Sequence, residues 1–238
     1  MSWPEVVIAL ALVLLGALLQ GSIGFGANLV TAPAIVLFEP SFVPGPAIVL
    51  SFAVSLIVAD RERAEFRMSD LRWGLLGRVP GTVLGVVIVS RISQGDIGLV
   101  VGPAVLVAVL LVSLGRGVAR TAWTLFAAGV VSSIMGTAAA VGGPAMALVY
   151  HDAPGPELRG SMSVYIGVGS VLSIGLLTAV GRFGASELVL VCTLMPAALL
   201  GVALSRRSAA RVDLGGTRTA VLLVSGLSAM LVLVKTIA

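Results

Sequence analysis

The chain has 238 residues, of which 58% are hydrophobic and only 11% are charged, and its mean hydropathy is +1.12. A soluble globular domain is about 45–50% apolar and about 25% charged, so this composition excludes a soluble domain and predicts an integral membrane protein. The net charge of +4 comes from basic residues in the gaps between apolar segments, where they set orientation in a lipid bilayer, so no nucleic-acid partner is expected.

Apolar segments follow one another along the chain, separated by short polar gaps. Runs of this length are typical of an α-helical bundle rather than of the alternating strands of an outer-membrane barrel, so the predicted fold class is all-α. The stretch before Arg61 contains no Lys or Arg. It therefore lacks the basic start of a signal peptide, and we expect the first segment to be retained. The predicted segments are 5–38, 44–59, 73–90, 97–115, 121–150, 160–181, 187–205 and 217–236.

An internal repeat links the two halves of the chain. The stretch "PGTVLGVVIVSR" at 80–91 resembles "PAALLGVALSRR" at 196–207, an offset of 116 residues, and the same offset aligns Gly26 with Gly142. Two distant landmarks that share one register indicate a duplicated unit. We therefore predict a single transmembrane domain over 1–238, built from a first repeat at about 1–118 and a second at about 119–238.

Glycines interrupt the first segment of each half, in "QGSIGFGANLVTAP" and in "GTAAAVGGPAMALVY". A continuous helix over 5–38 would be about 51 Å long, whereas the hydrocarbon core of a bilayer is about 30 Å thick. Each interrupted segment is therefore either one broken and strongly tilted crossing or a re-entrant hairpin of two shorter helices.

The loop charges discriminate between these two models, because each model assigns the later loops to different sides. If each interrupted segment crosses once, the basic residues divide eight against six. If each is a hairpin, they divide eleven against three, with Arg91, Arg182 and Lys235 on the poorer side, and this obeys the positive-inside rule. The hairpin model predicts that loops 60–72 and 206–216 are cytoplasmic, that both termini are outside, and that the halves form an inverted repeat.

The two breaks are candidate anion sites. A new helix is expected near Ala27 and near Pro144, and a helix start offers free N–H groups and a positive dipole end. Small polar residues nearby add neutral donors: Ser22, Asn28 and Thr31 in the first half, and Ser132, Ser133 and Thr137 in the second. The alternative is that these small residues only permit close helix packing. The predicted substrate-binding residues are Ser22, Gly24, Gly26, Asn28, Arg78, Thr137, Gly142, Gly143 and Pro144.

Arg78 is the charged residue that lies well inside a predicted helix, and a guanidinium suits oxyanions. It lies only about 9 Å of helical rise past Trp73, so snorkelling to the cytoplasmic surface is the alternative. The carboxylates, His151 and Cys192 form no cluster of the kind that proton relays, metal sites or catalytic triads need. We therefore predict no enzyme, no catalytic residue, no metal and no cofactor.

Taken together, "GSIGFGANLVTAP", "FVPGP", "GRVPGTVLG", "GTAAAVGGPAMALVY" and "LRGSMSVY" resemble the TauE/SafE family of sulfite and organosulfonate exporters over nearly the whole chain. The resemblance implies export of small sulfur-containing or carboxylate anions across the bacterial inner membrane. The family motifs fall on Gly21, Gly24, Gly26 and Pro33, and on Gly136, Gly142, Gly143 and Pro144. The first half has "GAN" where glycines are usual, which makes Asn28 a candidate for tuning the site.

The expected function is electrogenic efflux of a small anion through a midplane site at the two breaks. No carboxylate is available there for a coupled cation, and the membrane potential favours outward movement of an anion. A passive anion channel and a non-transporting membrane subunit are the alternatives. The expected partners are the anionic substrate, the lipid bilayer and, in a homo-oligomer, a second copy of the chain.

Overall fold

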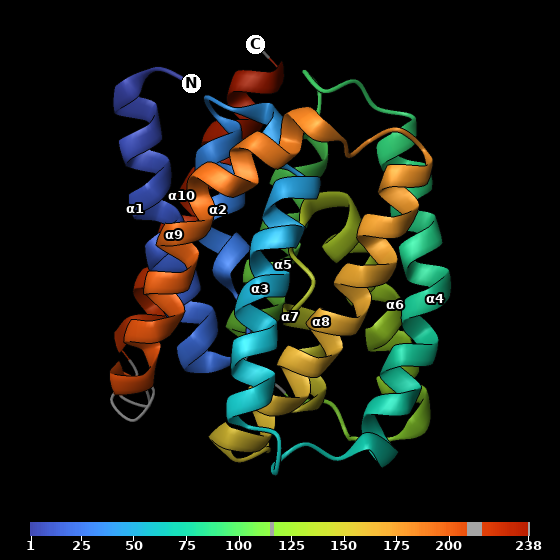
Figure 1. Cartoon of the computed structure of the whole chain (residues 1–238). Coiled ribbons are helices and arrows are strands. Elements are labelled where there is room, and N and C mark those ends of the chain that lie inside the picture. The colour runs from blue at the N-terminus through green and yellow to red at the C-terminus, as the bar shows by residue number, and fades with distance from the viewer. Residues whose placement is uncertain (115–116, 209–215, 238) are drawn as a thin grey trace.

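The computed structural model describes residues 1–114, 117–208 and 216–237, and in these residues every regular element is helical (Figure 1). The first half contains α1 (Trp3–Ile23), α2 (Ala27–Val36), the 3-10 helix η1 (Pro40–Phe42), α3 (Gly45–Arg61), α4 (Met68–Ser90) and α5 (Gly98–Leu114). The second half contains α6 (Ala122–Ala139), α7 (Pro144–Val149), α8 (Gly155–Ala179), α9 (Ala185–Ser208) and α10 (Gly216–Ile237). The all-α prediction is confirmed.

Both predicted breaks are present. Helix α1 ends before Gly24, and Gly24 and Gly26 have positive φ angles of 92° and 95°, a conformation that glycine adopts without steric cost. Helix α6 ends before Ala140, which adopts a left-handed φ of 61°. New helices begin at Ala27 and Pro144, as the sequence predicts, and Pro144 stands in the first turn, where its missing N–H costs no hydrogen bond.

The two arms of each broken segment differ in length, which was not predicted from the sequence. Helix α1 has 21 residues and α2 has 10, whereas α6 has 18 and α7 has 6. In the described residues, five helices are long and apolar enough to cross a membrane, and α1 and α6 are among them with α4, α8 and α9. The chain is therefore a multi-pass membrane protein, and the first arm of each broken segment has the length of a full crossing.

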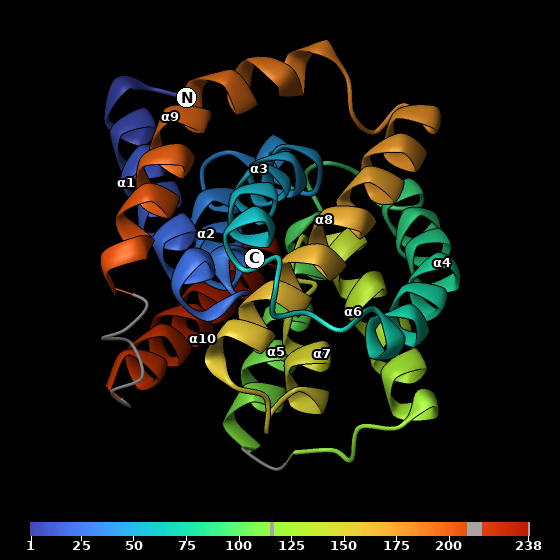
Figure 2. The ribbon, with the colours of Figure 1, turned by 60° about the horizontal axis from the view of Figure 1, so that its bottom comes forward.

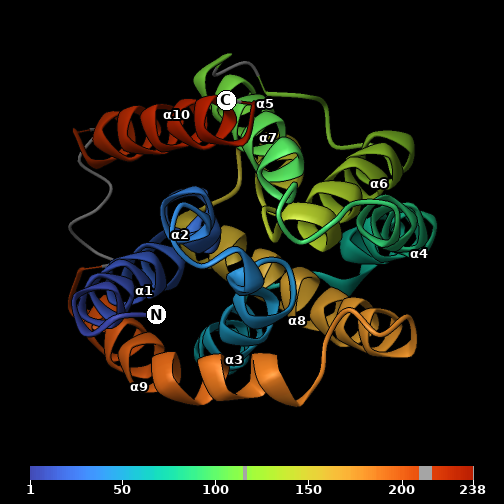
Figure 3. The ribbon, with the colours of Figure 1, turned by 90° about the horizontal axis from the view of Figure 1, so that it is seen from above.

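The helices pack in pairs that each combine the two halves. Helix α4 lies against α6, and α9 lies against α1 on the other side of the bundle, while α3 contacts α8 and α5 contacts α10 (Figures 2 and 3). Gly85 and Gly201, which are 116 residues apart, make the first two contacts possible. A Cβ on Gly85 would lie 2.7 Å from Thr137 Cβ, and one on Gly201 would lie 2.3 Å from the Leu14 carbonyl oxygen.

Corresponding helices run in opposite directions. In Figure 1, α1 and α3 run from the upper end of the molecule to the lower end, whereas α6 and α8 run upward. The N-terminus and the end of α10 both lie at the upper end, and the loop between α3 and α4 lies at the lower end. Part of the 206–216 loop, residues 209–215, lies outside the described residues.

Candidate functional site

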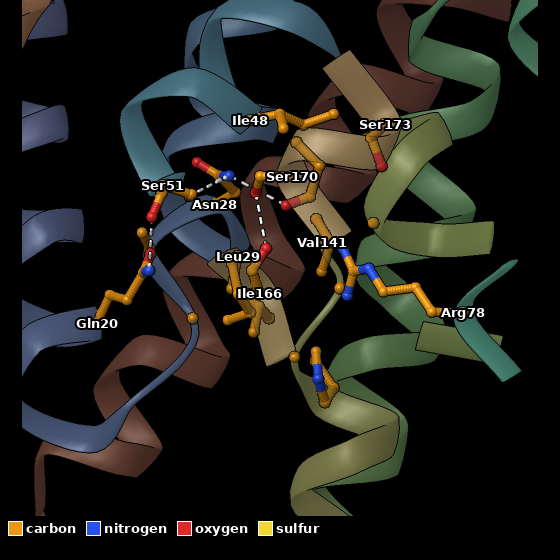
Figure 4. A pocket seen from close by; sticks show the side chains of 17 residues that line it. Gln20, Asn28, Leu29, Ile48, Ser51, Arg78, Val141, Ile166, Ser170 and Ser173 are labelled. Atoms are coloured by element: carbon orange, nitrogen blue, oxygen red, sulfur yellow. Dashed lines mark hydrogen bonds between the residues drawn. The ribbon is translucent and has the colours of Figure 1, made fainter. Parts of the chain in front are cut away.

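A cavity lies where the two broken segments meet α3, α4 and α8 (Figure 4). The centre of a water molecule can occupy about 30 Å³ of it, roughly twice what one water requires. Among the described residues that line it, Arg78 is the charged one. The lining consists of Gln20, Gly26, Ala27, Asn28, Leu29, Ile48, Ser51, Arg78, Gly136, Ala140, Val141, Gly142, Gly143, Pro144, Ile166, Ser170 and Ser173.

Arg78 points into the protein and not toward the membrane surface (Figure 4). Only 4% of the residue is exposed, so the snorkelling alternative is wrong. Helix α4 begins at Met68, five residues before the predicted start, which places Arg78 about 15 Å along the helix, or half the thickness of the hydrocarbon core. The outward face of α4 is apolar, with Leu76 and Val79 each 54% exposed. Arg78 lies on the other face of this helix and therefore points into the protein.

The Arg78 guanidinium lacks the partners that a buried charge normally has. Its Nε and Nη1 are buried without a hydrogen-bond partner among the described residues. None of the ion pairs found in that part of the chain includes Arg78. Its Cζ instead lies 4.4 Å from the ring centroid of Tyr165 on α8. A buried cation without a carboxylate is costly, which makes Arg78 a candidate contact for an anion.

Glycines on α4 let the helix approach α6 closely on both sides of Arg78. A Cβ on Gly77 would lie 2.1 Å from the Phe126 carbonyl oxygen, and one on Gly81 would lie 2.4 Å from the Val130 carbonyl oxygen. Small residues of this kind allow helix backbones to touch in a membrane. The long Arg78 side chain therefore extends past α6 and reaches α8.

Asn28 joins the two breaks and is not left free for a substrate. Its Nδ2 donates to the Ala140 carbonyl oxygen at 3.0 Å, to Ser51 Oγ at 2.9 Å and to the Ala47 carbonyl oxygen at 3.3 Å. Its Oδ1 accepts from Thr31 Oγ1 at 2.9 Å. The structure therefore connects Asn28 to α3 and to the second broken segment.

The other predicted hydroxyl donors also have partners inside the protein. Ser22 Oγ donates to the Leu18 carbonyl oxygen at 2.7 Å, and Ser22 does not line the cavity. Thr137 Oγ1 lies 2.8 Å from Ser173 Oγ, and of these two residues only Ser173 reaches the cavity. Ser132 Oγ accepts from the Met146 N–H at 3.1 Å. This acceptor satisfies one of the backbone donors that were expected at the start of α7.

The predicted glycines and Pro144 divide into those that line the cavity and one that does not. Gly26, Gly142, Gly143 and Pro144 line the cavity, and a Cβ on Gly143 would lie 2.5 Å from Phe25 Cβ, so the two breaks contact each other directly. Gly24 does not line the cavity. A Cβ there would lie 2.8 Å from Arg159 Cα, so Gly24 allows the end of α1 to pack closely against the start of α8.

Polar residues on α1, α3 and α8 that were not predicted from the sequence also line the cavity. Gln20 Nε2 donates to Ser55 Oγ at 3.0 Å and to the Ser51 carbonyl oxygen at 3.2 Å. Ser170 and Ser173 reach the cavity from α8. A signal was present, because Ser163, Gly167 and Ser170 repeat with the spacing of one helix face.

Two groups of ion pairs lie outside the cavity, at the lower end of the bundle in Figure 1. Arg120 contacts Glu157 at 2.6 Å, Asp152 at 3.0 Å and Asp70 at 3.7 Å. The Arg120 guanidinium donates to the Asp152 carboxylate and holds its pKa below the ordinary value. Glu62 pairs with Arg61 at 3.1 Å and with Arg159 at 2.9 Å. These contacts connect the two halves at that end.

A known protein family matches the chain over both of its halves. The family model described as "Sulfite exporter TauE/SafE" matches residues 8–232. The chain belongs to the TauE/SafE family. The resemblance found in the sequence motifs is confirmed, and the match covers both halves of this TauE/SafE protein. None of the curated proteins and none of the solved structures compared with the chain matches it.

Proposed function

We propose that the protein exports a small sulfur-containing anion, such as sulfite or a sulfonate, through the cavity at the two breaks. Membership of a family of sulfite exporters supports this substrate class. The observation that carries the proposal is Arg78, a guanidinium with 4% exposure and no carboxylate partner among the described residues. An oxyanion next to it would accept charge-assisted hydrogen bonds, which are stronger than neutral ones.

The proposed substrate-binding residues combine this charge with the backbone of the two breaks. Arg78 supplies the charge, and Gly26, Gly142 and Gly143 line the cavity beside it. Ser170 and Ser173 line the same space from α8 and replace Ser22 and Thr137, which do not line it, as the proposed hydroxyl contacts. The Ser170 hydroxyl donates to the Ile166 carbonyl oxygen at 2.8 Å, so it would have to turn from that bond to donate to an anion. Asn28 holds the two breaks together, so we assign it an indirect role.

We propose that efflux is electrogenic and needs no coupled cation. Among the described lining residues none is acidic, so the cavity offers no carboxylate to a proton or a sodium ion. A cell interior that is negative by 100 mV favours outward movement of one negative charge by about 2.3 kcal/mol, which sustains roughly fiftyfold accumulation outside. The potential alone is then a sufficient driving force.

We further propose that the two halves form an inverted repeat in a bacterial inner membrane, with re-entrant broken segments and both termini outside. The opposite directions of α1 and α6 support this (Figure 1). So does the grouping of Arg61, Arg120 and Arg159 at the end that the positive-inside rule assigns to the cytoplasm. Each of the main helix pairs also combines one helix from each half, as an inverted repeat would lead us to expect.

Flux from liposomes tests the proposal. Purified protein is reconstituted with sulfite or methanesulfonate inside, and efflux is followed while valinomycin and potassium gradients set the membrane potential. We expect saturable efflux that increases as the interior becomes negative, and exchange of labelled for unlabelled substrate. Flux that follows a pH gradient and ignores the potential would overturn the electrogenic mechanism. Single-channel currents would favour a channel, and no flux of any anion would favour a non-transporting subunit.

A further inference from the structure

We infer that Tyr165 and Gly169 on α8 form a seat that positions the Arg78 guanidinium for the anion. The name seat refers to these two residues only. They lie one helical turn apart on α8, whereas Arg78 comes from α4. The inference rests on the proposed function because it assigns the residues that hold the binding charge in place.

Gly169 provides the space that the guanidinium occupies. A Cβ on Gly169 would lie 1.2 Å from Arg78 Nε, 1.5 Å from Cζ and 2.0 Å from Nη2. These distances are far below any van der Waals contact, so every other residue at this position would displace the guanidinium. A glycine is therefore required at position 169 if the guanidinium is to lie there. No turn or positive φ explains this glycine, because it lies inside α8.

Tyr165 provides the surface on which the guanidinium lies. Its ring centroid is 4.4 Å from Arg78 Cζ, a distance at which the face of an aromatic ring attracts a cation. The Tyr165 hydroxyl donates to the Gly129 carbonyl oxygen at 2.9 Å and lies 3.0 Å from Ser133 Oγ. These two contacts with α6 fix the orientation of the ring.

An aromatic ring suits this task better than a carboxylate. A carboxylate pairs with arginine through the N–H groups in the plane of the guanidinium, and those are the donors that an oxyanion needs. A ring below the plane stabilises the charge without using them. Nε and Nη1 accordingly have no hydrogen-bond partner among the described residues. The seat holds the cation and leaves its donors available.

The seat belongs to one half of the repeat. At the offset of 116 residues, Arg78 corresponds to Leu194, Tyr165 to Val49 and Gly169 to Ala53. Leu194 is fully buried in the apolar core. The second copy of this position therefore carries neither the charge nor the ring. An anion would meet a charged wall on the α4 and α8 side of the cavity and an uncharged one opposite.

The test is a set of α8 variants with a matched control. Gly169→Ala should displace the guanidinium and raise the KM for sulfite efflux by about tenfold or more, with a smaller change in kcat. Gly175→Ala is the control, because a Cβ there meets nothing within 4 Å on the same helix, and it should keep the wild-type KM. Tyr165→Leu should raise KM more than Tyr165→Phe, since only the phenylalanine retains the ring.

A double-mutant cycle of melting temperatures tests the seat without a transport measurement. Gly169→Ala should lower the melting temperature of the purified protein when Arg78 is present, and should have little effect in an Arg78→Ala background, where the clashing atoms are gone. Equal effects in both backgrounds, or a wild-type KM for Gly169→Ala, would overturn the seat. If the wild type transports no anion, the proposed function fails, and the double-mutant cycle still decides whether Gly169 holds Arg78.

Discussion

Asn28 and Ala140 lie 112 residues apart in the chain, and the side-chain amide of Asn28 donates to the Ala140 carbonyl oxygen at 3.0 Å. This hydrogen bond joins the first turn of α2, just after the break in the first half, to the break in the second half. Ala140 has a left-handed φ of 61°, which turns the chain out of α6 between Ala139 and Val141. The bond therefore links the two halves at the wall of the cavity, and its loss should affect both stability and transport.

Asn28→Asp tests this link, because the substitution preserves shape and removes the donors. The Ala140 carbonyl would lose its partner and face a carboxylate. We expect the free energy of unfolding to fall by about 1–3 kcal/mol and anion efflux to drop strongly. Thermal melting in detergent and liposome flux are the measurements. Thr193→Ala, which removes an exposed hydroxyl on α9, should change neither, and a wild-type Asn28→Asp protein would show that the link is dispensable.

Arg78→Ala should abolish efflux in folded protein, because the cavity would lose its only described charge. Arg78→Lys should restore only part of the rate, since an ammonium has no planar fork of donors. Arg72→Ala is a matched control on the same helix, because Arg72 is exposed and lies 5.3 Å from the Trp73 ring centroid. Efflux and size-exclusion profiles are compared. Full activity of Arg78→Ala would exclude Arg78 from the transport path.

The two cavity glycines should respond differently to substitution. A Cβ on Gly142 would lie 3.1 Å from both Gly136 Cα and the Ser132 carbonyl oxygen, so Gly142→Ala should already impair efflux by crowding. A Cβ on Gly26 would make only ordinary contacts of 3.8 Å with Ile23 and Leu29, but Gly26 has a φ of 95°, which asparagine tolerates better than alanine. Gly26→Asn should therefore be more stable than Gly26→Ala.

Leucine at Gly26 should block efflux by filling the cavity, and leucine at Gly142 should block it by pushing the second break away from the α6 backbone. Liposome flux and melting temperatures of the Gly26 and Gly142 variants are measured together. Normal flux in both leucine variants would show that the breaks only serve helix packing.

Cysteine labelling determines the sidedness. In a Cys192→Ser background, Ser69→Cys at the start of α4 should be labelled from the cytoplasm, and Ser93→Cys after α4 should be labelled from outside. Both serines are exposed. A membrane-impermeant maleimide applied to intact cells and to inverted vesicles distinguishes the two sides. Strong labelling of position 69 in intact cells would contradict the hairpin topology.

Asp152→Asn should lower the melting temperature at neutral pH, because the Asp152 carboxylate accepts a hydrogen bond from Arg120 at 3.0 Å. The pKa of Asp152 is lower in the folded protein than its ordinary value of 3.8. This contribution to stability is therefore present above that ordinary value and is lost as the pH falls through the lower folded-state pKa. The difference in melting temperature between wild type and variant should shrink as the pH is lowered from 7 toward about 3.

Asp60→Asn is the control for this pH series, because Asp60 and its partner Arg63 are 80% and 81% exposed. Exposed ion pairs contribute little, so this variant should melt like the wild type at every pH. A pH-independent effect of Asp152→Asn would show that its pairing with Arg120 does not contribute to folding.

The candidate site could be located from the sequence, but the contacts within it could not. The glycine breaks indicated where the main chain leaves the helix, and new helices do begin at Ala27 and Pro144. Ser22, Asn28 and Thr137 were expected to face a substrate, yet each has a hydrogen-bond partner within the protein. The partners of Asn28 and Thr137 are brought close only when the chain folds, so no local pattern contains this information. Ser22 instead donates to Leu18 four residues earlier, a bond that a serine inside a helix commonly makes.

Composition and hydropathy by themselves determined that the chain is an all-helical membrane protein. The free energy of placing apolar residues in lipid adds up along the sequence, and the backbone groups of a segment in lipid must be paired within a helix. The 116-residue offset likewise related Gly85 to Gly201 before any contact was known. Only the tertiary structure decided that Arg78 points inward and lies on Tyr165 over Gly169. A helix can direct a long side chain either way, and the outcome depends on whether a neighbouring helix leaves space for it.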